Sequence, residues 1–173
     1  MARSVTGYSP MQVGLHWTVA ILVAFQFFAH DGIETAWRAF TRGEEMPEDN
    51  VSLLAGLHIA AGILILTLAL ARIYLRITRG VPPPPADEPR LLQIAAEAVH
   101  GIIYLLLILL PISGAVAWFA GVKPAGGVHA LLTNLLLGAI ALHIAGALFQ
   151  HFVRRSSVLM RMFKPEQAPR HRS

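Results

Sequence analysis

Two histidines in one apolar stretch, His129 and His143, are the residues whose spacing says most about chemistry. At about 100° per residue, fourteen residues of α-helix return to within about 40° of the starting direction. Both imidazoles therefore lie on one helix face, about 21 Å apart along the axis. This separation is most of the roughly 30 Å hydrocarbon thickness of a bilayer. One helix can thus present a nitrogen ligand near each membrane surface, which suits two stacked cofactors better than a single metal ion.

The composition indicates a membrane protein. Of 173 residues, 55% are hydrophobic and 14% are charged, and the mean hydropathy is +0.57, which is unlike the usage of soluble domains. Four apolar stretches are long enough to cross a bilayer, and they cover residues 12–30, 52–76, 93–120 and 129–153. They predict an all-α membrane protein, a single domain over residues 1–173 built as an up-and-down bundle of four transmembrane helices.

Lys and Arg residues are divided unequally between the two ends of the predicted bundle. Three of the fourteen, Arg38, Arg42 and Lys123, fall at one end, and eleven fall at the other. Because positive charge is retained on the inner side, both termini and the proline-rich loop 77–92 are expected in the cytoplasm. The high isoelectric point therefore reports topology and does not indicate a nucleic-acid partner. The eleven inner residues are Arg3, Arg72, Arg76, Arg79, Arg90, Arg154, Arg155, Arg161, Lys164, Arg170 and Arg172.

This topology brings four histidines to two depths. His16 lies early in the first span and His143 late in the fourth, so both are expected near the cytoplasmic surface. His58 lies early in the second span and His129 early in the fourth, so both are expected near the outer surface. Each pair joins two helices, as axial ligation of a b-type haem by two histidines in a bundle requires. Ionisable groups are costly in a bilayer and tend to be functional, which favours haem ligation over structural hydrogen bonding.

Cysteine is absent from the chain. Its absence excludes thiolate-bound iron–sulfur clusters, covalently attached c-type haem and disulfides. Zinc is disfavoured because it needs three or four ligands at one point. The alternative without haem is a transporter or proton channel that uses the histidines as relays.

Further polar residues gather at the predicted cytoplasmic end. Arg72 follows His58 by fourteen residues, so it faces inward at the depth of the inner pair and could neutralise haem propionates. Arg76 lies one turn closer to water, where the positive-inside rule explains it equally well. His100 and His151 are spare inner histidines that could bind a quinone carbonyl or pass a proton.

In these features the chain resembles the bacterial four-helix dihaem cytochrome b561 family, which is related to the cytochrome b subunits of membrane hydrogenases and formate dehydrogenases. The resemblance covers nearly the whole chain, and the interval between His129 and His143 is its most specific element. A short outer connection over residues 121–128 departs from family members that carry a longer segment there. The other matching positions are Tyr8-Ser9, Leu15-His16-Trp17, Leu57-His58, Gly62, Arg72, Arg76, His100, Ile103-Tyr104-Leu105-Leu106, Leu110-Pro111, Gly114 and Leu142-His143.

The resemblance implies a multi-pass protein of the bacterial inner membrane that holds two b haems. One haem would be ligated by His16 with His143 on the cytoplasmic side, and the other by His58 with His129 on the periplasmic side. Electrons would pass between a periplasmic donor and membrane ubiquinone. Superoxide is one such donor, because the family includes superoxide oxidases. The alternative is a non-catalytic relay subunit that docks a dehydrogenase or a soluble cytochrome.

The expected partners are membrane lipid, quinone and a periplasmic electron donor or redox protein, and formation of a homo-oligomer stays open. We expect quinone exchange at the cytoplasmic end, with His100 or His151 assisting proton transfer, because a quinone that takes up electrons also takes up protons. An outer quinone site that uses His30 is the alternative.

Overall fold

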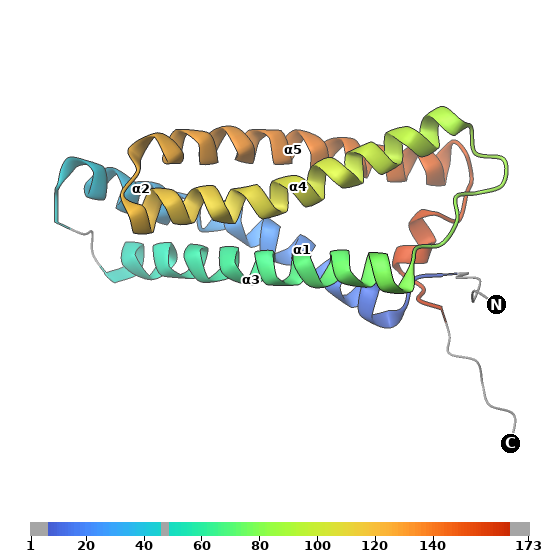
Figure 1. Cartoon of the computed structure of the whole chain (residues 1–173), viewed down its shortest axis with the longest axis horizontal. Coiled ribbons are helices and arrows are strands. Elements are labelled where there is room, and N and C mark those ends of the chain that lie inside the picture. Colours follow the sequence, from blue (N-terminus) through green and yellow to red (C-terminus); the bar gives the residue numbers. More distant parts are fainter. Residues whose placement is uncertain (1–6, 46–48, 167–173) are drawn as a thin grey trace, which may run out of the picture.

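The computed structural model describes residues 7–45 and 49–166, and within them it contains five α-helices, one short 3-10 helix and no strand. Four long helices run side by side along the molecule, with α2 near one end and η1 near the other (Figure 1). The predicted four-helix bundle is thereby confirmed. The elements in chain order are α1 (Pro10–Phe28), α2 (His30–Arg42), α3 (Asp49–Arg79), α4 (Arg90–Ala120), α5 (Lys123–Phe152) and η1 (Leu159–Met162).

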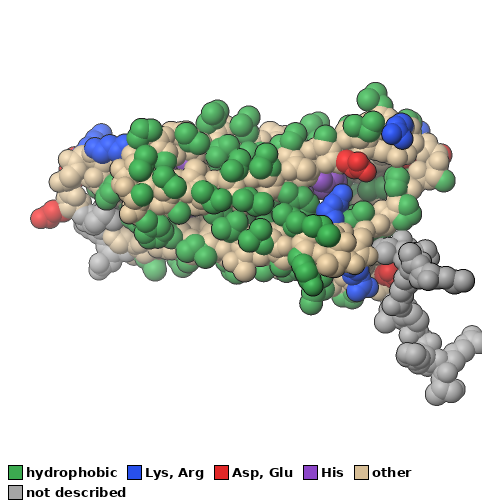
Figure 2. All heavy atoms as spheres, in the orientation of Figure 1, with side chains coloured by type: hydrophobic (Ala, Val, Ile, Leu, Met, Phe, Trp, Pro, Cys, Tyr) green, Lys and Arg blue, Asp and Glu red, His purple; other side chains and the backbone are tan. Residues whose placement is uncertain are grey.

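The outside of the bundle is apolar along its length. Each of the four long helices has a window apolar enough to cross a membrane, and at most 22% of any such window is buried inside the protein. Figure 2 shows hydrophobic side chains spread over the middle of one face, with charged side chains near the two ends. Apolar surface on this scale is stable only against lipid. The protein therefore crosses the membrane with all four long helices.

A small apolar core lies between the helices at mid-depth. Its fully packed members come from all four long helices, and Leu136 of α5 lies halfway between His129 and His143. This layer keeps water out of the centre of the bundle and separates the two histidine levels. The core residues are Val19, Val23, Ile65, Ala69, Leu106, Leu107 and Leu136.

Helix α1 begins with a strong N-terminal signal. Ser9 and Gln12 form a reciprocal capping box, and Pro10 occupies the first helical turn, where its missing N–H is not needed. The Gln12 side chain also donates to the Gly80 carbonyl at 3.0 Å, which ties the start of α1 to the end of α3. Helix α4, in contrast, continues through Pro111 without ending.

The proline-rich cytoplasmic loop is fastened to the end of α5. Arg154 donates to the Asp87 carboxylate at 3.1 Å, and Gln150 donates to the Glu88 carboxylate at 2.6 Å. The loop and the ends of α3 and α5 thus gather most of the described cations at one end, as the charge count predicted. The remaining inner cations, Arg3, Arg170 and Arg172, lie outside the described residues.

Helix α2 is a fifth helix, which the sequence analysis did not predict. Its small residues Gly32, Ala36 and Ala39 are buried, and α2 packs closely against α3. A Cβ atom added at Gly32 would lie 2.4 Å from the Cβ of Leu54 in α3, a distance that no packed side chain tolerates. The strongly amphipathic pattern of residues 30–42, closed by Gly43 in the left-handed conformation, was the signal available for this helix.

We predict that Gly32→Ala destabilises the outer end of the bundle by roughly 1–3 kcal/mol, because the added methyl group overpacks the α2–α3 contact. Thermal unfolding of the protein in detergent measures the loss. Gly56→Ala is the matched control, since a Cβ atom there meets nothing within 4 Å. Equal melting temperatures for the two variants would contradict the close contact.

Candidate functional site

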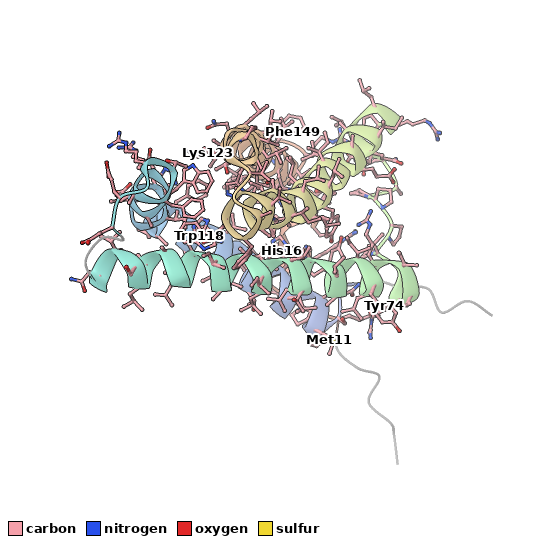
Figure 3. All side chains as sticks on the ribbon, turned by 60° about the vertical axis from the view of Figure 1, so that its left-hand side comes forward. Met11, His16, Tyr74, Trp118, Lys123 and Phe149 are labelled. Atoms are coloured by element: carbon pink, nitrogen blue, oxygen red, sulfur yellow. The ribbon has the colours of Figure 1, made fainter. Side chains whose placement is uncertain are left out.

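The cytoplasmic half of the bundle contains the first histidine pair. His16 of α1 and His143 of α5 face each other with ring centroids 6.2 Å apart and planes inclined by 58°. In Figure 3, His16 lies among the long helices, whereas the side chains of Met11 and Tyr74 point away from the bundle. Both imidazoles are partly buried. Two helices that are distant in sequence thus place one nitrogen-bearing ring on each side of a common gap.

The outer half contains the second pair. His58 of α3 and His129 of α5 have ring centroids 6.3 Å apart and planes inclined by 64°. Helix α5 therefore supplies one member of each pair, and α1 and α3 supply the others. The two pairs have nearly equal separations although they share only one helix.

These separations fit a metal ion held between two imidazoles. An ion bonded to one nitrogen of each ring at about 2 Å holds the ring centres roughly 6 Å apart. The pairs at 6.2 and 6.3 Å meet this requirement. His100 and His143, in contrast, are in edge contact at 4.9 Å, which leaves no room for an ion between them. The geometry thus selects His16, and not His100, as the ring opposed to His143.

The ring of His129 is held in an orientation suited to a ligand. Its Nδ1 lies 3.0 Å from the Leu110 carbonyl oxygen and 3.2 Å from the Ser113 hydroxyl. A carbonyl only accepts, so Nδ1 carries the proton and Nε2 keeps a free lone pair. Gly114 gives the ring its space, because a Cβ atom there would lie 3.1 Å from His129. This arrangement matches the way in which outer partners orient metal-bound histidines.

His16 has a different partner. The Arg72 guanidinium lies 3.0 Å from His16 Nδ1, and because a guanidinium only donates, this nitrogen is the acceptor. The same guanidinium carbon lies 5.4 Å from the centre of the Tyr104 ring. Arg72 thus lies at the depth of the inner pair, facing inward. For Nε2 of His16 to hold a metal ion, Arg72 would have to leave Nδ1, so that Nδ1 could carry the proton instead.

A cleft opens beside His16 at the cytoplasmic end. Its lining combines two arginines, two tyrosines and two histidines, and is therefore rich in hydrogen-bond donors for a small polar group. Burial raises the pKa of the Tyr8 hydroxyl above its ordinary value, although Arg76 opposes the effect, so this hydroxyl remains a donor at neutral pH. The lining residues are Tyr8, Gln12, His16, Arg72, Arg76, Val81, His100, Tyr104 and Met162.

The two spare inner histidines lie in different places. His100 lines the cleft, and its Nδ1 donates to the Ala96 carbonyl at 2.6 Å, which leaves Nε2 as an acceptor. His151 does not line the cleft and packs its ring against Phe152 at 4.8 Å. At the outer end, His30 is exposed and lies 3.7 Å from the Glu34 carboxylate. The fold therefore brings only His100 of these three to the inner pair.

The segment after α5 folds back over the cleft. The indole of Trp17 donates to the Met162 carbonyl at 2.8 Å, and its ring packs against Phe163 at 5.0 Å. Arg161 donates to the Pro83 carbonyl at 2.7 Å. Met162 thereby becomes part of the cleft wall. Sequence reasoning missed this role because nothing local to a Met near the end of a chain indicates it.

An aromatic cluster closes the outer end. Phe40 of α2 stacks on Trp37 at 5.5 Å and on Trp118 of α4 at 5.8 Å. Lys123, labelled near Trp118 in Figure 3, donates to the Thr41 carbonyl at 2.7 Å. Helix α2 is thus fastened to the outer ends of α4 and α5, on the side of the second pair.

The bundle and its two histidine pairs define a membrane protein of the cytochrome b type. The sequence matches the family described as prokaryotic cytochrome b561 over residues 7–165. The chain belongs to this family. It is thus a multi-pass protein of the bacterial inner membrane that binds haem b and transfers electrons.

Several curated relatives align along nearly their whole length. Cytochrome b562 of Cereibacter sphaeroides is 33% identical over 162 residues, which cover 92% of this chain and 96% of the relative. The probable superoxide oxidase CybB of Yersinia pestis is 29% identical, with 90% and 94% covered. Cytochrome b561 homolog 1 of Escherichia coli K12 is 28% identical, with 90% and 96% covered.

Proposed function

We propose that the protein holds two b haems and conducts electrons across the membrane between a periplasmic donor and ubiquinone. His16 with His143 would ligate the inner haem, and His58 with His129 the outer one. The observation that carries this proposal is the pair of opposed ring separations, 6.2 and 6.3 Å, at two depths of one bundle. When bound, the haems supply one-electron carriers at each membrane surface.

The chain's own residues would orient and neutralise these groups. The Leu110 carbonyl keeps the His129 Nδ1 protonated, so that Nε2 can bind iron. Arg72 and Arg76 offer positive charge to the carboxylates of the inner haem. Gly114 leaves space beside His129 where a larger side chain would press on the ring.

The haem proposal predicts two low-spin b haems per chain, neither covalently attached. His129→Ala should retain only the inner haem and His143→Ala only the outer one, because the two residues are about 21 Å apart along α5. Pyridine haemochrome analysis and acid–acetone extraction measure both points.

Asn134→Ala is the control for these variants, since within residues 7–45 and 49–166 this exposed side chain hydrogen-bonds only to the Ala130 carbonyl of its own helix. It should keep two haems. A single haem in the unmodified protein, or one that survives extraction, would overturn the proposal.

The cytoplasmic cleft is the proposed site of quinone exchange. Tyr8 and Tyr104 line it with hydroxyl groups that can donate to a quinone carbonyl, and His100 adds an imidazole for proton transfer. The arginines would attract negative charge that develops on the ring as electrons arrive. A cleft at the membrane surface also lets protons come from water, without an ionised group deep in the bilayer.

We expect His100→Ala to slow quinone reduction at least about tenfold, because it removes a proton-transfer group from the cleft. The rate is measured with both haems retained, using a water-soluble ubiquinone analogue. His151→Ala is the control and should leave the rate unchanged. Loss of activity in His30→Ala, with unchanged rates in the other two variants, would move the site to the periplasmic end.

Superoxide is the donor that we propose, prompted by the likeness to the probable superoxide oxidase of Yersinia pestis. Two superoxide ions would each give up one electron and leave as dioxygen, and one ubiquinone would take both electrons and two protons. Electrons that move inward oppose an inside-negative potential, at about 2.3 kcal/mol per charge and 100 mV. The donor must therefore be a stronger reductant than the quinone by that margin, which superoxide satisfies.

The donor is tested by exposing the oxidised, purified protein to enzymatically generated superoxide. We expect the haem absorbance to show reduction, followed by formation of ubiquinol in a ratio of about one quinol for two superoxide ions consumed. Added superoxide dismutase should abolish both signals. Haem reduction that is no faster than in the presence of dismutase would favour the relay subunit, for which a dehydrogenase or a soluble cytochrome is the donor.

A further inference from the structure

Helix α1 carries a polar amide on its outer half, within an otherwise apolar sequence. This residue, Gln26, lies ten residues after His16, and its side chain is partly buried. Its Nε2 donates to the backbone carbonyl of His58 in α3 at 3.1 Å. Burying an amide in a bilayer costs free energy unless the amide is hydrogen-bonded, so the partners of this amide indicate its role. Here the partner is the residue that also supplies an imidazole to the outer pair.

Two polar atoms at this contact are buried and unsatisfied. Among the residues that the structure describes, neither Oε1 of Gln26 nor Nδ1 of His58 has a hydrogen-bond partner. Oε1 of Gln26 is a hydrogen-bond acceptor, and Nδ1 of His58 is a nitrogen that can carry a proton and donate it. Buried groups of this kind are nearly always paired in a working protein. The two unsatisfied atoms belong to side chains of residues already in contact with each other.

His129, the other member of the outer pair, has a hydrogen-bond acceptor of the kind that His58 lacks among the described residues. His129 has an acceptor, the Leu110 carbonyl, for its Nδ1, and such a partner fixes the tautomer and raises the basicity of a ligating imidazole. For His58, Gln26 Oε1 is the acceptor at hand, because it sits on the same amide that already touches the His58 backbone.

Gly62, one turn beyond His58, leaves room for this amide. A Cβ atom at Gly62 would lie 3.5 Å from Gln26 Nε2, which is ordinary contact. Alanine would therefore fit, whereas a branched side chain would push the amide away. The space around Gln26 is thus bounded by α3 itself, on the same side as His58.

We propose that Gln26 is a positioning residue for the outer haem, with its Oε1 accepting a hydrogen bond from Nδ1–H of His58 when Nε2 of His58 binds iron. This inference rests on the proposed function of His58. A more basic imidazole stabilises the oxidised iron, so Gln26 lowers the midpoint potential of the outer haem. A lower outer potential also favours the onward transfer of electrons to the inner haem.

The experiment compares Gln26→Leu with Gln26→Glu in the haem-bearing protein, by spectroelectrochemical titration of both haems. Leucine removes the acceptor and should raise the outer midpoint potential. Glutamate keeps an acceptor and should leave that potential at the original value or below it. The inner potential should stay constant in both variants. Asn134→Leu is the matched control, an amide-to-leucine change on the exposed surface of α5, and should move neither potential.

Gly62→Val provides a second route to the same result without changing Gln26. By displacing the amide it should raise the outer potential as Gln26→Leu does, which keeps the proposal testable if the leucine variant fails to fold. An unchanged outer potential in the variant that folds, or a rise of equal size with leucine and glutamate, would overturn the role of Gln26. Failure to find two haems in the unmodified protein would instead overturn the proposed function.

Discussion

A nitrogen-bearing ring inside a bilayer has to find its partners within the protein, and the architecture of this bundle follows from that constraint. Lipid offers an imidazole neither donor nor acceptor, so the rings face inward in pairs. Helix α5 organises the arrangement, since its fourteen-residue interval puts His129 and His143 on one face at two depths. The apolar core around Leu136 occupies the space between them, and the outer surface of the bundle is left to lipid.

The surroundings of the two pairs differ in charge, and the difference supports the proposed inward direction of electron transfer. Arg72 brings a positive charge to the depth of the inner pair, and a nearby cation lowers the energy of an added electron. The outer pair is contacted instead by a backbone carbonyl and an uncharged amide. An electron would therefore be held more tightly at the cytoplasmic site, against the direction in which the membrane potential drives it.

Both ends of the bundle are closed by segments that are not part of the four-helix pattern. Helix α2 is fastened over the outer end by an aromatic cluster in which Phe40, Trp37 and Trp118 contact one another. At the cytoplasmic end, the segment around Met162 is pinned by Trp17 and narrows the cleft beside His16. The chain segments outside the four long helices thus pack at the two ends of the bundle, while the long helices supply the rings.

Hydropathy and histidine spacing were enough to predict the four spans and the two levels at which histidines of different helices meet, because both depend on distance along a helix axis. The sequence alone did not show that Arg72 contacts Nδ1 of His16 or that Gln26 contacts the backbone of His58. Nor did it show that the His100 ring lies too close to His143 for an ion to fit between them. Those contacts depend on how helices far apart in the sequence are rotated against one another. Helix periodicity does not specify that rotation, and the packing of small residues such as Gly32 and Gly114 decides it.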